Sequence, residues 1–343
     1  MSLKKINIAV LGATGFVGLD LVNILSKHKH VNIKYLCAQK NIGKSINQFD
    51  KRIKKKLPKI SNLFNINWNK VELIFFSLPN GEAQKIILKI INYKHLKFID
   101  LAADFRLKNP LIYKKNYGQK HYAKNLIKFS IYSIAEFVKK EIKKYRIIGN
   151  PGCYPTSIQL PLIPILKKNL INTNNIIIDS KSGYSGAGKD YKKKFIHKNF
   201  YNSVCAYSVN YHRHMSELDQ QFKLYSKKEL KFTFSPHLIP TFRGLLSTIH
   251  IELKKGVNLN KIYNLLIKFH KKNKFVKILK KNSAISTGDV IGTNNCIISI
   301  CGTRYKNKII IFSAIDNLIK GASGQAVQNM NLLYGLNETT GLL

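Results

Sequence analysis

The sequence predicts an α/β protein with two domains, one built on a doubly wound parallel sheet and the other an α+β domain with a mixed sheet. Strand-like and helix-like runs alternate from the N-terminus to about residue 150, which is typical of βαβ units. A glycine-rich turn follows the first strand-like run, and beyond residue 150 longer, turn-rich links separate the strand-like runs. With 343 residues, 45% of them hydrophobic, the chain is long enough for two domains that each bury a core.

The chain opens with a strand, a glycine turn and a helix. Residues 6–11 are a short apolar run, residues 12–18 read GATGFVG, and residues 19–25 have the spacing of an apolar helix. Glycines at such a turn let the backbone approach a pyrophosphate, which then lies at the helix N-terminus. The spacing is G-x-x-G-x-x-G, and its position directly after the opening strand favours a Rossmann-type dinucleotide site over a simple tight turn.

The second strand, residues 32–37, indicates which dinucleotide is bound. An NAD site usually has a carboxylate about 20 residues past the glycines, which holds the ribose 2′-hydroxyl. Here no Asp or Glu lies between Asp20 and Asp50, and the strand is followed by the amide of Gln39 and the ammonium of Lys40. Such donors suit a 2′-phosphate, so the sequence predicts NADP (NADPH) as the cofactor.

The remaining runs of the first half continue the alternation. Residues 71–77 and 96–101 are strand-like, and residues 82–91 between them read as a helix. Residues 146–148 are expected to be the last strand of this sheet. Parallel sheets of this kind bind ligands at the carboxyl ends of their strands. We therefore expect residues 1–150 to form an NADP-binding domain.

Residues 149–156, GNPGCYPT, set Cys153 in a tight turn ahead of an apolar segment, residues 158–166. The segment reads as a helix whose first turns are uncertain because of Pro161 and Pro164. Backbone N–H groups and the positive end of a helix dipole stabilise a thiolate, and the same groups can hold an oxyanion on a carbon that the sulfur attacks. A cysteine in general is more often a buried apolar residue. The Gly and Pro residues on both sides favour a nucleophile here.

The second half has the pattern of a mixed or antiparallel sheet, followed by a helix that returns to the first domain. Its strand-like runs are residues 175–181, 230–234, 246–253, 296–303 and 309–314. Residues 318–333 have helix spacing and carry several small residues, which permit close packing. We expect residues 151–315 to form the catalytic, substrate-binding and oligomerisation domain, and residues 316–343 to complete the NADP-binding domain.

His212-Arg213-His214 supplies the acid and base that a thiol nucleophile needs. Two histidines at i and i+2 share one face of an extended segment. A single histidine is more often a surface or core residue, but the second imidazole and the following Glu217 favour a site. Of the two, His214 is preferred as the acid/base partner of Cys153 and His212 as the group nearer a substrate anion, and the reverse assignment stays open.

The formal net charge is +41, and a strongly basic protein can bind nucleic acid or an anionic membrane. The lysines are scattered in runs such as residues 51–56, 139–144 and 271–281, without an arginine-rich tract, and they accompany abundant Ile and Asn. Compositional bias explains this pattern as well as a function does. We expect no specific nucleic-acid partner, although anionic substrates are attracted.

Cysteine usage and hydropathy indicate the compartment. The five cysteines lack C-x-x-C spacing, which disfavours a disulfide framework or a metal site. No apolar run reaches the roughly 18 residues of a membrane span, and the first strand begins too early to leave room for a signal peptide. The sequence thus predicts a cytoplasmic protein in a reducing compartment, with no metal and no membrane contact.

Seven motifs, in order, extend over nearly the whole chain. They are GATGFVG at 12–18, DLAADFRL at 100–107, GNPGCYPT at 149–156, KSGYSGAGK at 181–189, HRHMSE at 212–217, SPHLIPTFRG at 235–244 and DNLIKGASGQAVQNMN at 316–331. With them the chain resembles the N-acetyl-γ-glutamyl-phosphate reductases of arginine biosynthesis, which share a group with aspartate-semialdehyde dehydrogenase. The resemblance implies an oxidoreductase in which Cys153 displaces phosphate from an acyl phosphate, and NADPH reduces the resulting thioester to an aldehyde.

The resemblance also implies site residues and an assembly. It makes Cys153, His214 and His212 the catalytic residues, and it places Arg106, Arg243 and Glu217 at the substrate. The implied cofactor contacts are Gly12, Thr14, Gly15, Phe16, Val17, Pro79, Ser185, Gly186, Gly188 and Asn317. A homo-oligomer, either a dimer or a tetramer, is expected.

Three positions depart from the pattern of that family: Asn80 in place of a histidine, Ala102 in place of a serine and Ser216 in place of a proline. They bear on the geometry around the nicotinamide and on the rigidity of residues 212–214. Two other functions stay open. One is a related reductase of aspartyl phosphate or of a carrier-linked acyl phosphate, and the other is a basic nucleic-acid-binding protein on the same fold.

Overall fold

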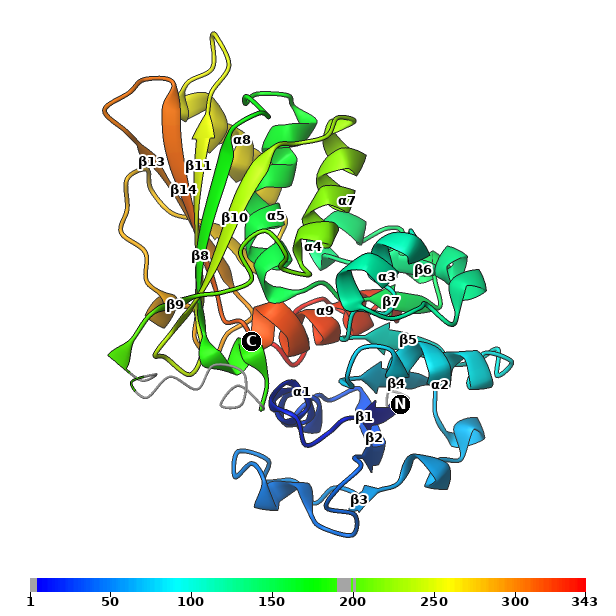
Figure 1. Cartoon of the computed structure of the whole chain (residues 1–343). Coiled ribbons are helices and arrows are strands. Elements are labelled where there is room, and N and C mark those ends of the chain that lie inside the picture. The colour runs from blue at the N-terminus through cyan, green and yellow to red at the C-terminus, as the bar shows by residue number, and fades with distance from the viewer. Residues whose placement is uncertain (1–4, 190–198, 200–201) are drawn as a thin grey trace. The chain divides into compact units, whose positions relative to one another are not determined.

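The computed structural model describes residues 5–189, 199 and 202–343. The chain forms two units, of which the first comprises Met1–Pro151 and Ala322–Leu343 and the second comprises Gly152–Gly321. Each unit contains one seven-stranded sheet with helices packed on it (Figure 1).

The sheet of the first unit is parallel throughout, in the order β3-β2-β1-β4-β5-β7-β6. Its strands are β1 (Ile6–Leu11), β2 (Val31–Cys37), β3 (Ile60–Ser61), β4 (Leu73–Phe76), β5 (Lys97–Asp100), β6 (Ser130–Tyr132) and β7 (Ile147–Gly149). Its α-helices are α1 (Phe16–Ser26), α2 (Glu82–Ile90), α3 (Pro110–Tyr117), α4 (Ala135–Val138) and α9 (Gly324–Leu333). An order that places β1 between β2 and β4 is that of dinucleotide-binding sheets, so the predicted fold class is confirmed for this half.

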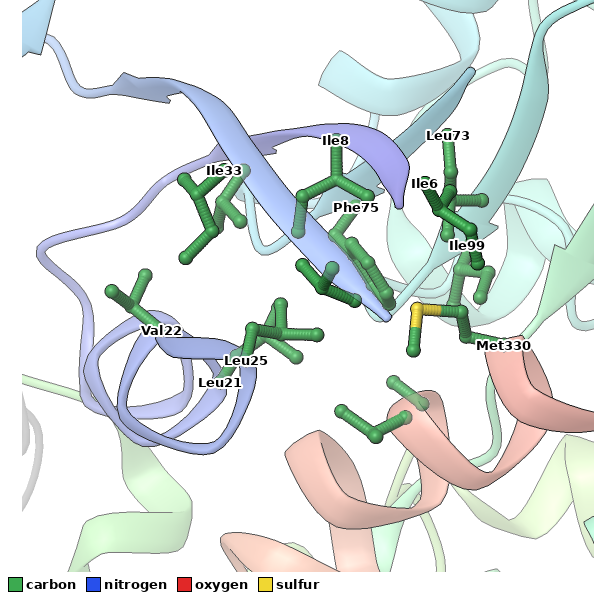
Figure 2. Packing of buried hydrophobic residues seen from close by; sticks show 14 of the residues in the cluster. Ile6, Ile8, Leu21, Val22, Leu25, Ile33, Leu73, Phe75, Ile99 and Met330 are labelled. Carbon is green, nitrogen blue, oxygen red and sulfur yellow. The ribbon is translucent and has the colours of Figure 1, made fainter. Parts of the chain in front are cut away.

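The side chains of β1 alternate between two apolar cores, as a strand covered on both faces requires. Ile8 and Val10 lie in the core that includes α1 and α9, whereas Ala9 and Leu11 lie in the core that includes α2. Figure 2 shows the first of these cores, in which Met330 of α9 lies among side chains of the sheet. The C-terminal helix is therefore part of the core of the first unit.

The sequence missed the two edge strands of this sheet. β3 has two residues and β6 has three, too few for a hydrophobic period to be recognised. β7, predicted as the last strand, pairs with β5 on one side and with β6 on the other. It is therefore an interior strand, and it delivers the chain to the turn that carries Cys153.

The sheet of the second unit is mixed, in the order β12-β13-β14-β11-β8-β10-β9. Its strands are β8 (Ile176–Gly183), β9 (Cys205–Ala206), β10 (Phe232–Ile239), β11 (Leu245–Glu252), β12 (Val276–Ile278), β13 (Cys296–Gly302) and β14 (Lys308–Ile315). Two pairs, β8 with β10 and β12 with β13, are parallel, and the others are antiparallel. The predicted mixed sheet is confirmed; β9 and β12, which are short edge strands, were not predicted.

Three helices cover one face of this second sheet: α5 (Cys153–Lys167), α7 (Met215–Ser226) and α8 (Leu259–His270) (Figure 1). α5 packs on β11 and β14, and it also contacts α7 and α8. The hydroxyl groups of Ser157 on α5 and Ser180 on β8 both lie within hydrogen-bond distance of the Ser247 hydroxyl on β11, at 2.9 and 2.8 Å. These buried bonds fix α5 on the sheet.

The start of α5 corrects the sequence analysis. The helix was placed at residues 158–166, but it begins at Cys153 itself and runs through both internal prolines. Pro164 has no N–H to donate to the carbonyl of Leu160, four residues earlier. The imidazole Nε2 of His270 lies 3.0 Å from that carbonyl oxygen and replaces the missing donor. A partner from α8 thus satisfies the carbonyl group that the proline leaves without its helical donor.

Candidate active site

Cys153 is the first residue of α5, and Gly152 is the N-cap with extended backbone, φ −71° and ψ 162°. The first N–H groups of a helix have no partner within the helix, and its dipole places partial positive charge at this end. The first turn of α5 contains no acidic residue whose charge would repel a thiolate on Cys153. The half-buried Cys153 side chain is therefore at a position that stabilises a thiolate.

The imidazole of His214 lies against the backbone next to Cys153. A Cβ atom at Gly152 would lie 2.5 Å from His214 Nε2, so only glycine allows this approach. His214 is the residue before the first turn of α7, and its ring is placed by the start of that helix. The fold thus brings together the predicted nucleophile and the predicted acid/base residue, 61 positions apart in sequence.

Glu217 lies behind this pair and is fully buried. Its Oε2 accepts a hydrogen bond from the Gly152 N–H at 3.0 Å, and its Oε1 is 3.9 Å from His214 Nε2. The resemblance implied that Glu217 binds the substrate. In the structure its carboxylate is bonded to the turn that precedes Cys153, and its contact with the substrate stays a prediction.

A second glycine, Gly321, permits close packing against Cys153 from another direction. A Cβ atom at Gly321 would lie 2.6 Å from the Cβ of Cys153. Gly321 belongs to a π-helical turn, Ile319–Ser323, which directly precedes α9. Sequence reasoning noted small residues in this segment but did not connect any of them with the cysteine.

His212 lies among aromatic rings. Its ring centroid is 5.4 Å from that of Tyr154, 5.5 Å from that of Tyr207 and 5.5 Å from that of Phe234. Burial, with a smaller contribution from Arg213, lowers the pKa of His212 to about 3. Its imidazole is therefore neutral at neutral pH, which does not suit the predicted position near a substrate anion.

The predicted residues of the SGAG turn and of the segment after β14 contact each other. Asn317 Oδ1 accepts a hydrogen bond from the Gly244 N–H at 2.8 Å, and its Nδ2 donates to Ser185 Oγ at 2.9 Å. Beside them Arg243 Nη1 donates to the fully buried Asp316 Oδ2 at 3.1 Å. Within the second unit, these bonds connect the turn of Ser185, Gly186 and Gly188 and the segment of Arg243 to the same short segment, residues 316–317.

In the glycine turn of the first unit, a side chain would collide with the backbone at Gly12 and at Gly18 but not at Gly15. A Cβ at Gly12, where φ is +82°, would lie 2.1 Å from the carbonyl oxygen of Ser77, and a Cβ at Gly18 would lie 2.2 Å from that of Gly12. At Gly15, the N-cap of α1, the nearest atom would be 3.5 Å away. The space beside Gly15 at the N-terminus of α1 is compatible with a phosphate group, as a pyrophosphate site requires.

The turn with Pro79 is held by a buried carboxylate. Asp104 Oδ1 accepts from the Gly81 N–H at 2.7 Å and its Oδ2 accepts from the Gln84 N–H at 3.1 Å, so it caps the N-terminus of α2. The Tyr113 hydroxyl donates to the same carboxylate at 2.7 Å. Pro79 itself is exposed at the carboxyl end of the sheet, where ligands bind in this fold.

Arg106 is the other predicted substrate residue, and it belongs to the first unit. Its Nε donates to the carbonyl of Asn150 at 2.7 Å and its Nη2 donates to that of Leu101 at 2.9 Å. Two of its nitrogen atoms thus bond to backbone. Arg106 thus helps to hold the segment that leads to Cys153, and its contact with the substrate stays a prediction.

Asn150 is a residue that sequence reasoning missed. Its Nδ2 donates to the carbonyl of Ala322 at 3.2 Å and its Oδ1 accepts from Asn329 Nδ2 at 3.0 Å. Ser133 Oγ donates to Asn329 Oδ1 at 2.7 Å. The signal that was available is the series of amide side chains in the apolar helical pattern of residues 324–333, because such groups need buried partners.

At two of the positions that depart from the family pattern, Ser216 and Ala102, the structure shows a hydrogen bond to a neighbouring residue. Ser216 donates its hydroxyl to the carbonyl of Arg213 at 2.7 Å, so a hydrogen bond restrains the loop where the family has a proline. Ala102 is buried, and its N–H donates to Asp100 Oδ1 at 3.0 Å. No contact of Asn80 explains its difference from the family.

Within the described residues, no group of three or more His, Cys, Asp and Glu side chains is arranged to hold a metal ion. None of their helices is both long and apolar enough to cross a membrane.

Family models match both units. Residues 7–145 match a semialdehyde dehydrogenase NAD-binding domain, and residues 153–317 match a semialdehyde dehydrogenase dimerisation domain. The structure is similar to aspartate semialdehyde dehydrogenase II of Vibrio cholerae, with a TM-score of 0.74 at 18% identity over 97% of this chain and 99% of the other. The fold is therefore that of the semialdehyde dehydrogenases, which are two-domain nicotinamide-dependent oxidoreductases.

Sequence relatives narrow this class. The chain is 41% identical to an N-acetyl-gamma-glutamyl-phosphate reductase of Ehrlichia canis, over 98% of this chain and 97% of the relative. It is 40% identical to a probable chloroplastic N-acetyl-gamma-glutamyl-phosphate reductase of Arabidopsis thaliana, over 99% of this chain and 84% of the relative. The chain belongs to the N-acetyl-gamma-glutamyl-phosphate reductase family, as its seven motifs predicted.

Proposed function

We propose that this chain reduces N-acetyl-glutamyl 5-phosphate to N-acetyl-glutamate 5-semialdehyde, with release of phosphate and consumption of NADPH, in arginine biosynthesis. The observation that carries the proposal is the pair formed by Cys153 at the N-terminus of α5 and the His214 imidazole against Gly152. Family membership supports the substrate, because relatives of nearly full length carry that activity in their names.

Cys153 is the nucleophile in this proposal. Its thiolate attacks the acyl carbon, a C–S bond forms and the C–O bond to phosphate breaks, which leaves a thioester on the enzyme. The first-turn N–H groups of α5 stabilise the thiolate before the attack and the oxyanion during it. When bound, NADPH supplies the hydride that reduces the thioester, after which the C–S bond breaks and releases the aldehyde and the sulfur.

His214 moves the proton. It takes the thiol proton before the attack, and it protonates the sulfur or the oxyanion when the reduced intermediate forms and collapses. Its position at the start of α7, beside the buried Glu217, fixes the ring next to the cysteine turn. General acid/base catalysis of this kind is worth on the order of 10²–10⁴ in rate.

The first unit binds NADP in this proposal. Thr14 to Val17 and Gly12 form the pyrophosphate turn, and the open space at Gly15 fits that role. Asp20 and Asp50 are the acidic residues that flank β2 in the sequence. Both are bonded to Arg52, at 2.7 Å and 2.6 Å, which disfavours either as the carboxylate of an NAD site. Lys40 is exposed just beyond β2 and suits the 2′-phosphate.

Two arginines recognise the anionic substrate. Arg243 is oriented by its ion pair with Asp316, and Arg106 by two backbone carbonyls. A planar guanidinium whose orientation is fixed by such bonds suits the recognition of a carboxylate or a phosphate.

We also propose a homo-oligomer in the cytoplasm. The face of the second sheet opposite α5 carries Leu246, Ile310 and Phe312, which are only partly buried within one chain. This face belongs to the segment that matches a dimerisation domain, and a second copy of the chain would bury it. No disulfide joins the five cysteines, all of which lie within the described residues.

A reverse assay tests the proposal. N-acetyl-glutamate 5-semialdehyde, phosphate and NADP should give phosphate-dependent NADPH formation, with NAD a much poorer acceptor because no carboxylate holds its ribose. Aspartate semialdehyde in the same assay is the control. A kcat/KM that favours aspartate semialdehyde would identify a related reductase, and salt-sensitive DNA binding without activity would identify the basic binding protein.

A further inference from the structure

We propose that His212, Tyr207 and Tyr154 form a hydrogen-bonded brace that holds the backbone of His214 at a fixed distance from the helix turn of Cys153. His212 is then a positioning residue rather than one that contacts the substrate. The kinetic test of this inference rests on the proposed function. The hydrogen bonds of the brace can be tested without it.

The direction of each hydrogen bond in the brace is determined. The backbone N–H of His214 can only donate, and it lies 3.1 Å from His212 Nδ1, which must therefore accept. In a neutral imidazole the proton is then on Nε2, and this N–H donates to the Tyr207 hydroxyl oxygen at 3.4 Å. Tyr207 donates to the Tyr154 hydroxyl oxygen at 3.2 Å.

The brace ends on the sheet. The Tyr154 hydroxyl donates to the backbone carbonyl of His237 on β10 at 3.2 Å. Each of the three side chains thus donates its proton to the next acceptor of the brace, so a proton on His212 Nδ1 would break the first bond. A chain in which every donor has an acceptor is more favourable in a low-dielectric interior than its separate bonds.

The surroundings of His212 favour this single tautomer. Its side chain is packed by Tyr154, Tyr207 and Phe234, and only 7% of the residue is exposed. Burial lowers its pKa to about 3. The imidazole stays neutral at any pH at which the proposed reaction is measured, and it therefore serves as a fixed donor and acceptor.

The brace connects both groups of the proposed reaction. Tyr154 directly follows Cys153 in the first turn of α5, and its buried side chain anchors that turn. His214 stands at the other end, with its ring against Gly152. A misplacement of about 1 Å between reacting groups can cost about 10²-fold in rate. The brace is therefore expected to act on kcat and to leave substrate affinity nearly unchanged.

Two substitutions of His212 separate positioning from substrate contact. Asn places an oxygen where Nδ1 lies, so His212→Asn keeps the acceptor for the His214 N–H, whereas His212→Leu removes it. We expect His212→Leu to lower kcat about 10- to 100-fold, as loss of a supporting partner commonly does. His212→Asn should recover most of that loss, with KM within about twofold of the wild-type value in both variants.

Tyr207→Phe tests the middle of the brace, and Tyr211→Phe is its matched control. Tyr211 lies four positions away and is 88% exposed, so its substitution removes a hydroxyl of the same kind outside the brace. Tyr207→Phe should lower kcat several-fold, because one hydrogen bond of the brace is lost, and Tyr211→Phe should not lower it. Equal effects of the two substitutions would overturn the proposal.

Nitrogen-15 NMR of histidine-labelled enzyme gives a readout that does not need activity. The His212 signal, assigned by its loss in His212→Asn, should report Nε2–H and unprotonated Nδ1 from pH 8 down to pH 5. An imidazolium or an Nδ1–H tautomer at pH 7 would overturn the brace, as would a large rise in KM with unchanged kcat in His212→Asn. If the wild-type protein lacks the proposed activity, the proposed function fails while this spectrum still decides the geometry.

Discussion

At the scale of single residues, two glycines determine how closely the candidate catalytic groups approach. Gly152 leaves room for the His214 ring, and Gly321 leaves room for the Cys153 side chain. Neither has a positive φ, so backbone conformation does not require glycine at either position. Close contact between side chain and backbone requires it, and a single methyl group at either position would separate atoms that the proposed reaction needs together.

We predict that Gly152→Ala lowers kcat by about 10-fold or more, because the new Cβ would lie 2.5 Å from His214 Nε2 and displace the ring. Gly321→Ala should act similarly through Cys153. The matched control is Gly302→Ala on β13, where the nearest atom would be 3.7 Å away and no shift is needed. Steady-state kinetics check this, and a fully active Gly152→Ala would contradict the placement of His214.

Sequence patterns singled out Cys153 and the histidines as candidates but not the groups that contact them. Cys153 was singled out because Gly and Pro residues mark a turn in the linear sequence. Gly321, Asn150 and the contact between Glu217 and Gly152 were missed because each depends on a partner more than 60 positions away. The burial of His212 by Tyr207 and Phe234 could not be predicted because it is a tertiary property that no local spacing reports.

At the scale of elements, α5 is a helix with two internal prolines that nevertheless begins at the cysteine. The usual cost of an interior proline, about 3 kcal/mol or more, arises partly from a carbonyl that loses its donor. For Pro164 that carbonyl is Leu160, and the His270 imidazole on α8 bonds to it. The Asn273 amide lies 3.0 Å from His270 Nδ1 and, by donating to it, keeps the proton on Nε2. A side chain of α8 thus donates the hydrogen bond that a carbonyl group of α5 lacks because of Pro164.

We predict that His270→Ala lowers the free energy of unfolding by about 1–3 kcal/mol, because the buried Leu160 carbonyl loses its partner. Pro164→Ala in the same background should recover about 1 kcal/mol, since the new N–H at position 164 can donate to that carbonyl within the helix. Thermal unfolding of the single and double variants measures the coupling.

Pro161→Ala is the control for that experiment, because its N–H would face the carbonyl of Ser157 and not that of Leu160. It should show no coupling to His270→Ala. Equal coupling at positions 161 and 164 would mean that replacing either proline stabilises α5. The His270 imidazole would then not compensate specifically for the missing N–H of Pro164.

Long strands could be predicted from the sequence, and short strands could not. Interior strands such as β1 and β8 have enough apolar residues for their period to be recognised. The three residues of β6 and the two of β9 do not, and only pairing with a neighbouring strand makes them part of a sheet. The start of α5 was placed too late because Pro151, Gly152 and Pro155 indicate a tight turn, although a proline in the first turn of a helix is tolerated.

At the scale of the whole molecule, the charge of +41 has no counterpart in a specific binding motif. Family membership over nearly the full length assigns the chain to enzymes that act on an acyl phosphate with NADP, and these ligands are anionic. A positive field raises the local concentration of such ligands and also opposes self-association. Any oligomer must therefore bury enough apolar surface to offset that repulsion.

We predict that the wild-type protein is a dimer or larger in light scattering coupled to size exclusion, and that Phe312→Lys on the outer face of the second sheet lowers its mass toward that of one chain. Leu224→Lys on α7 is the control, because it adds the same charge at an exposed apolar residue on the helix-covered side. A wild-type monomer at all concentrations would contradict the proposed interface.

The central claim is that Cys153 carries the acyl group as a thioester, and mass spectrometry tests it most directly. The protein is mixed with N-acetyl-glutamyl 5-phosphate in the absence of NADPH, quenched in acid and digested. We predict an N-acetyl-glutamyl adduct on the peptide that contains Cys153, no adduct on the other four cysteines, and no adduct or turnover in Cys153→Ser. An adduct on another cysteine, or a Cys153→Ser variant that turns over at the wild-type rate, would contradict the account.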